Sequence, residues 1–96
     1  MNLPADQPVR RRILYGGDVQ GVGFRFTARE AAADHAVAGF VRNLRSRQVE
    51  VVVEGMPEEL DAFLADLAGR MAGYIGSTQV EQCPATGEFA MFEVRF

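Results

Sequence analysis

Two glycines and an arginine occur close together in the stretch DVQGVGFRFTARE, residues 18–30, in a spacing that suits the binding of an anion. Gly21 and Gly23 can adopt positive φ angles, so successive backbone N–H groups of the loop can point into one concavity. Arg25 adds a planar guanidinium whose donors match the oxygens of a phosphoryl group. We therefore predict a phosphate-binding loop with the following members: Gln20, Gly21, Val22, Gly23, Phe24 and Arg25.

The glycine loop differs from two common nucleotide-binding motifs. Phe26 occupies the third glycine or alanine position of a dinucleotide-binding fingerprint, and no lysine follows as it would in a P-loop. Two plainer interpretations remain open at this point: the loop is only a tight turn, or Arg25 forms a surface ion pair with a carboxylate. The side chain of Gln20 is interpreted as structural rather than catalytic.

The elements that would position this loop follow from the periodicity of the apolar residues. Val9 to Gly17 predicts a strand that ends at the loop, and the valines of VEVVVE predict another strand. Apolar residues at helical spacing indicate two helices, and Pro57 suits the first position of the second. Strands are predicted over residues 9–17, 39–43, 49–54, 78–83 and 91–96, and helices over residues 25–36 and 57–71.

This order of elements is that of the ferredoxin-like split βαβ sandwich, βαββαβ. We predict an α+β fold in which two helices cover one face of an antiparallel sheet, with a short extra C-terminal strand. A helix joins the strands over residues 9–17 and 39–43, so these should run parallel with another strand between them. Both then end at the same edge of the sheet, which brings the side chain of Asn43 near the loop. The alternative is that Asn43 only caps the following hairpin.

Three segments together resemble the acylphosphatase family: GDVQGVGFR over residues 17–25, GFVRN over residues 39–43 and VEVVVEG over residues 49–55. The similarity extends over nearly the whole chain after its N-terminal residues. It implies hydrolysis of acyl phosphates to a carboxylate and inorganic phosphate, which is expected to inhibit competitively. By similarity, Arg25 binds the phosphate, Asn43 orients the attacking water, and the backbone from Gln20 to Phe24 completes the phosphate site.

The chain departs from the family pattern at three places. The hairpin turn, which often carries a glycine in the family, reads Arg45-Ser-Arg47. Ala36 stands where a glycine commonly ends the first helix, and a left-handed backbone there would cost on the order of 1 kcal/mol. Residues 72–77 replace a link that contains Gly-Pro. These differences concern local stability and loop shape, because none of them lies in the predicted site.

The predicted chemistry requires neither a metal ion nor another cofactor. An acyl phosphate departs as a carboxylate, a weak base that needs no general acid at neutral pH. Phosphoryl transfer depends mainly on positioning and on stabilisation of charge, which an arginine and a set of N–H groups supply. The sequence has no cluster with metal-ligand spacing, and the single histidine, His35, is placed near the far end of the first helix.

The 96 residues suffice for one small domain, predicted over residues 9–96 after a flexible tail over residues 1–8. A net charge of −3 argues against a general nucleic-acid binder. No apolar run is long enough to span a membrane, and the N-terminus lacks the apolar segment of a secretory signal. Cys83 is the only cysteine, which fits a reducing compartment. We expect a cytoplasmic monomer that acts on a small molecule, without nucleic-acid or membrane partners.

Two other functions remain open. The first is a catalytically silent module that binds a small anion, such as a phosphorylated metabolite, or RNA; the sheet lacks the aromatic signature of RNA-recognition domains. The second is a partner domain like the acylphosphatase-like segment of hydrogenase-maturation carbamoyltransferases, in which a further domain would be expected after Phe96. An assay with benzoyl phosphate distinguishes both from an active acylphosphatase.

Overall fold

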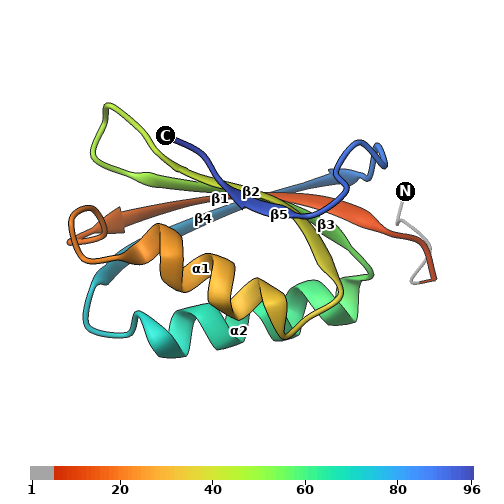
Figure 1. The fold of residues 1–96 in the computed structure, drawn as a ribbon, viewed down its shortest axis with the longest axis horizontal. Coiled ribbons are helices and arrows are strands. Elements are labelled where there is room, and N and C mark those ends of the chain that lie inside the picture. Colours follow the sequence, from red (N-terminus) through yellow and green to blue (C-terminus); the bar gives the residue numbers. More distant parts are fainter. Residues whose placement is uncertain (1–5) are drawn as a thin grey trace.

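A five-stranded sheet carries both helices on one face, as Figure 1 shows for the computed structural model, which describes residues 6–96. The strand order across the sheet is β4-β1-β3-β2-β5. The predicted ferredoxin-like α+β fold is therefore confirmed. The elements are β1 (Val9–Gly17), α1 (Phe24–Ala33), β2 (Val37–Asn43), β3 (Val49–Gly55), α2 (Pro57–Arg70), β4 (Ile75–Pro84) and β5 (Phe92–Val94).

The tail predicted over residues 1–8 lies mostly outside the described residues, so the division at residue 9 stays a prediction. Within the part of the chain that is described, neither helix combines the length and the apolar character needed to cross a bilayer. Residues 6–8, which precede β1, form no helix or strand.

The sheet is mixed rather than wholly antiparallel. β1 pairs antiparallel with both β3 and β4, and β2 pairs antiparallel with β3. β5 instead lies parallel to β2, with Gly39 opposite Phe92, so the prediction of an antiparallel sheet is wrong at this edge. The direction follows from the topology. β4 runs opposite to β1 and β2, and the chain reverses once after β4, so β5 must run the same way as β2.

The ends of several predicted elements also differ, and β4 begins at Ile75 rather than at Thr78. α1 ends at Ala33 rather than near Ala36, and β2 already begins at Val37. Arg47, with φ 73°, is the one non-glycine residue with a positive φ among residues 6–96, so the strain considered at Ala36 does not arise. The last strand ends at Val94, and Phe96 beyond it is 92% exposed instead of sharing the buried face of Phe92.

The core lies between the helices and the sheet. α1 buries Phe24 and three alanines, and the small alanine side chains allow the helix to lie close to the sheet. The apolar stripe predicted for the second helix is confirmed, since Leu60, Phe63 and Leu67 of α2 are fully buried. Burial of each such side chain stabilises the fold by about 1.5–3 kcal/mol. β3 contributes Val49, Val51 and Val53 to the same core.

Candidate functional site

The loop between β1 and α1 is anchored at both ends in the core. Val19 is 0% exposed and Phe24 is 2% exposed, and the Phe24 ring packs against Tyr15 with ring centroids 5.0 Å apart. Close to the first anchor, the backbone N–H of Asp18 donates to the carbonyl oxygen of Tyr74 over 2.9 Å. Between the anchors, residues 20–23 reach the surface. The loop is thus fixed in position while its backbone stays accessible to a ligand.

The backbone of this loop presents N–H groups without acceptors. Gly21 and Gly23 have φ angles of 79° and 77°, as predicted for a left-handed turn. α1 begins without a side-chain cap, and its first backbone hydrogen bond runs from Thr27 N–H to Gly23 O over 3.0 Å. None of the N–H groups from Gln20 to Phe26 finds an acceptor among residues 6–96. Unpaired N–H groups at the positive end of a helix dipole form a site for an anion.

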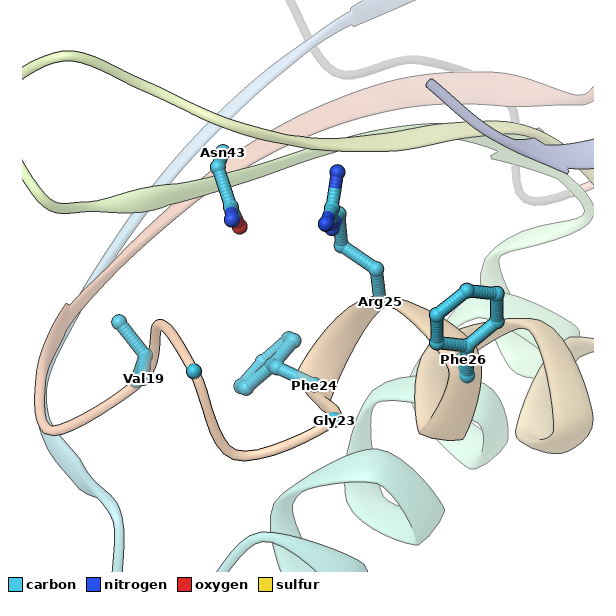
Figure 2. Close-up of a pocket in the computed structure, with 7 residues that line it drawn as sticks. Val19, Gly23, Phe24, Arg25, Phe26 and Asn43 are labelled. Carbon is cyan, nitrogen blue, oxygen red and sulfur yellow. The ribbon is translucent and has the colours of Figure 1, made fainter. Parts of the chain in front are cut away.

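A cavity of about 120 Å³ lies above these N–H groups. A water molecule takes up about 30 Å³ of liquid, so the cavity suits a small group of the size of a phosphoryl rather than an extended ligand. Figure 2 shows the labelled lining residues around the open space between the loop and the sheet. The lining residues are Val19, Gly21, Gly23, Phe24, Arg25, Phe26 and Asn43.

Arg25 rises from the first turn of α1 toward the sheet at one side of the cavity (Figure 2). Its Nη1 donates to the carbonyl oxygen of Arg95 over 3.2 Å, and its guanidinium carbon lies 4.6 Å from the centroid of the Phe96 ring. Within residues 6–96, Arg25 thus contacts a carbonyl oxygen and an aromatic ring, and not the carboxylate that a surface ion pair would require. A guanidinium has five N–H donors, so most of them remain for a ligand.

Asn43 is the last residue of β2, and its side chain hangs from the sheet toward the loop (Figure 2). β1 and β2 both pair antiparallel with β3, which lies between them, so they run parallel and end at one edge of the sheet. The predicted approach of Asn43 to the loop and Arg25 is therefore present in the structure. Asn43 is exposed. Within residues 6–96 the hydrogen bonds of the hairpin turn come from the backbone N–H groups of Leu44 and Arg47 and the side chains of Gln20 and Ser46, so the Asn43 side chain does not cap the hairpin.

The side chain of Gln20 points elsewhere, although its backbone belongs to the loop. Its Nε2 donates to the carbonyl oxygens of Leu44 and Gln48, over 2.8 Å and 2.9 Å. Neither Gln20 nor Val22 lines the cavity. Their part in the predicted phosphate site is limited to backbone N–H groups.

Sequence reasoning did not include Phe26, Arg95 or Phe96 in the site. Phe26 lines the cavity, and its ring lies 6.4 Å from that of Phe96, centroid to centroid. The sequence did contain a usable signal, because Phe26 directly follows Arg25 and falls outside the helical spacing of Phe24 and Ala28. No sequence signal pointed to Arg95 or Phe96, because they approach Arg25 only through the pairing of β5 with β2.

The part of the chain that the structure describes has no cluster of metal-binding side chains near the cavity. Across residues 6–96, no cluster of three or more histidine, cysteine, aspartate or glutamate side chains has a suitable arrangement. His35 lies in the turn after α1, where its Nε2 is 3.0 Å from Asp66 Oδ2 of α2. The polar groups at the cavity are thus an arginine, an amide and backbone N–H groups.

Both the sequence and the fold of this chain resemble those of known proteins. The family model described as Acylphosphatase matches residues 11–94. An acylphosphatase of Aeropyrum pernix is 42% identical over 93 residues, which cover 95% of this chain and 92% of that protein. The crystal structure of acylphosphatase from Bacillus subtilis superposes with a TM-score of 0.82 at 25% identity, covering 92% of this chain and 99% of that one. Full-length HypF in its phosphate- and nucleotide-bound form matches 94% of this chain but 12% of its own, with a TM-score of 0.79 and 27% identity.

Proposed function

Because the chain belongs to the acylphosphatase family and is an enzyme of that class, we propose that it hydrolyses small acyl phosphates at this cavity without a metal ion. The products are a carboxylate and inorganic phosphate. The observation that carries this proposal is the convergence of Arg25, Asn43 and the unpaired N–H groups on one cavity of about 120 Å³. Each of these groups has a distinct part in the reaction.

The phosphoryl group binds in the loop, where N–H groups from Gln20 to Arg25 donate to its oxygens. Arg25 supplies a fixed positive charge that also stabilises the charge on these oxygens as the reaction proceeds. The contact of its guanidinium with Phe96 and Arg95 limits how far the side chain can move. Preorganised donors of this kind stabilise a transition state more than flexible ones, because little reorganisation is needed.

Asn43 holds the attacking water. Its carboxamide offers one acceptor oxygen and two N–H donors, so it can orient a water without removing a proton. The water oxygen forms a bond to phosphorus while the bond from phosphorus to the acyl oxygen breaks in line with it. The bonding electrons leave with the carboxylate, and a water proton passes to a phosphate oxygen. No general acid is needed, because a carboxylate is a stable leaving group at neutral pH.

The proposal is tested by separating Arg25 from Asn43 kinetically, with benzoyl phosphate as substrate in the presence of a chelator. Arg25→Gln should lower kcat about 100- to 1000-fold and also weaken competitive inhibition by inorganic phosphate, because the fixed charge acts on both. Asn43→Ala should lower kcat steeply and leave the inhibition constant of phosphate within about threefold, because Asn43 contacts the water rather than the phosphate. Asn43→Asp should be at least as inactive, since it adds a negative charge beside an anionic substrate.

Circular dichroism and thermal unfolding must first show that each variant is folded. Near-normal kcat in folded Asn43→Ala would contradict the role of Asn43. An unaltered protein that binds phosphate but hydrolyses no acyl phosphate would be a silent binding module instead. A large loss of activity on chelation that magnesium reverses would contradict the metal-independent mechanism.

A further inference from the structure

Gln20 connects the phosphate loop to the β2–β3 hairpin through its side chain. The hairpin turn is closed by a hydrogen bond from Leu44 N–H to Gln48 O over 2.9 Å. The Gln20 amide donates to the carbonyl oxygens of these same two residues, at 2.8 Å and 2.9 Å. Both of its N–H donors are therefore used to bind the two ends of one turn. We call this arrangement the Gln20 clamp.

The clamp acts where the hairpin meets Asn43. Leu44 follows Asn43 directly, so a hydrogen bond to the Leu44 carbonyl restrains the peptide beside the Asn43 side chain. Pairing with β3 holds Asn43 opposite Val49, but it fixes the strand only relative to the sheet. For residues 18–24 and 43–48, the clamp supplies the hydrogen bonds that join loop to turn in the described structure.

We propose that Gln20 is a positioning residue, which sets the distance between the Asn43 amide and the phosphate loop. This inference rests on the proposed function, because it assumes that Asn43 holds the attacking water. A displacement of about 1 Å at a reacting group can lower a rate about 100-fold. Loss of the clamp should therefore lower kcat, while the loop N–H groups and Arg25 continue to bind phosphate.

The chemistry of the clamp indicates which substitution tests it. An amide places two donors on one nitrogen, whereas an ionised carboxylate of the same shape only accepts hydrogen bonds. In Gln20→Glu the carboxylate would face two carbonyl oxygens and be repelled. A cavity of about 230 Å³, lined by Gly17, Asp18, Gln20 and Arg47, lies beside it. The new side chain can turn into this space, so the variant should fold.

The experiment measures kcat with benzoyl phosphate and the inhibition constant of inorganic phosphate for Gln20→Glu, alone and together with Asn43→Ala. We expect Gln20→Glu to lower kcat about 10- to 100-fold and to change the inhibition constant less than about threefold. In the Asn43→Ala background the same substitution should lower kcat less than about twofold, because the group that it positions is absent. Ser46→Ala is the matched control, since Ser46 Oγ donates to Gln48 Oε1 within the turn and not to the loop.

Three results would overturn the proposal: normal kcat in Gln20→Glu, phosphate inhibition weakened as much as kcat, or an equal loss of kcat in the Asn43→Ala background. NMR relaxation of residues 43–48 gives a readout that does not depend on activity, and their mobility should rise in Gln20→Glu but not in Ser46→Ala. If the unaltered protein hydrolyses no acyl phosphate, the proposed function fails. The clamp is then tested by NMR alone, and unchanged mobility of residues 43–48 in Gln20→Glu would overturn it.

Discussion

Arg47 holds an unfavourable backbone conformation in the β2–β3 turn. Its φ is 73°, a left-handed value that costs an L-residue about 1–2 kcal/mol relative to a right-handed one. Its N–H donates to Leu44 O over 3.1 Å within this turn. The resemblance to acylphosphatases indicated that a glycine is common in this turn. In the structure, Arg47 is the residue of this turn at which a glycine should stabilise the fold.

At the residue scale, we predict that Arg47→Gly raises the free energy of unfolding by about 0.5–1 kcal/mol. Glycine removes the strain of the left-handed backbone, but it also gains more conformational freedom in the unfolded chain, which limits the benefit. Urea unfolding monitored by circular dichroism measures the change. Ser46→Gly is the control and should be destabilising, because Ser46 has no positive φ to relieve. A less stable Arg47→Gly protein would contradict the prediction.

Among the elements, α1 is distinguished by the left-handed glycine at its start. Gly23 occupies the N-cap position with φ 77° and offers no side-chain hydrogen bond to the first turn. Serine, threonine, aspartate and asparagine are also preferred there, and such a side chain would occupy an N–H group of the turn. A glycine cap leaves these N–H groups for an anion. The start of α1 thus serves ligand binding more than helix stability.

For this element we predict that Gly23→Ala weakens competitive inhibition by phosphate. An added Cβ would meet no atom within 4 Å, so the effect comes from the positive φ and not from a clash. The free loop of the variant can relieve this strain, of roughly 1.4 kcal/mol, by leaving the left-handed conformation. Phosphate binding must then restore that conformation, so the inhibition constant should rise about tenfold. Gly69→Ala in α2 is the control, because its Cβ is equally unobstructed and its φ is not positive.

The control should itself have a measurable effect on stability. Gly69→Ala should raise the free energy of unfolding by about 0.5–1 kcal/mol, since alanine loses less conformational entropy in a helix. Its phosphate inhibition should match that of the unaltered protein. Equal phosphate inhibition in Gly23→Ala and Gly69→Ala would argue against a phosphate site at the start of α1.

On the scale of the whole molecule, the two faces of the sheet are stabilised in different ways. The face under the helices is apolar, whereas the opposite face buries Glu50 and Glu54 of β3. Glu50 accepts hydrogen bonds from Arg12 of β1 and Arg42 of β2, each over 2.6 Å, and so joins three neighbouring strands. Glu54 accepts from Arg10 Nε over 2.7 Å and from the backbone N–H of Gly87 over 2.9 Å.

These contacts shift the pKa of both carboxyl groups in the same direction. Burial alone would raise the pKa of Glu50, but hydrogen bonds from Arg12 and Arg42 and their charges outweigh burial and lower it. Burial also opposes the shift at Glu54, where hydrogen bonds from Thr86, Arg10 and Gly87 lower the pKa. In the unfolded chain each glutamate returns to its ordinary pKa of about 4.3. Their ionised forms are therefore favoured by folding.

We accordingly predict that the free energy of unfolding falls as the pH drops below about 4. A group whose pKa is lowered by folding stabilises the protein above its unfolded pKa and loses this contribution as the pH falls through the folded pKa. Urea unfolding between pH 7 and pH 3 measures the dependence. Glu50→Gln and Glu54→Gln should each be less stable at pH 7 and show a weaker pH dependence below pH 4.

Glu81→Gln on the exposed strand β4 is the control for these variants and should keep the unaltered pH dependence. The assignment to Glu50 and Glu54 would be wrong if both glutamine variants lost stability with pH as steeply as the unaltered protein.

The sequence by itself determined the order of the elements and the main groups of the candidate site. Period-two valines, the apolar stripe of α2 and the glycines of the loop are local patterns, and each predicts its own structure. The approach of Asn43 to Arg25 was also predictable, although 18 positions separate them in the sequence. It follows from a general rule, because a helical crossover makes β1 and β2 parallel and brings their ends to one edge.

Only the tertiary structure decided what surrounds those groups. No local pattern relates the segments that are joined by the Gln20 clamp, by the contact of Arg25 with Phe96 and by the pairing of β5 with β2. The strained residue proved to be Arg47 rather than Ala36, because α1 ends at its C-cap Asp34 without a left-handed residue, whereas the β2–β3 turn places Arg47 in that conformation. Periodicity reports which side of an element is apolar, but hydrogen-bond partners depend on distances set only when the helices and the sheet pack together.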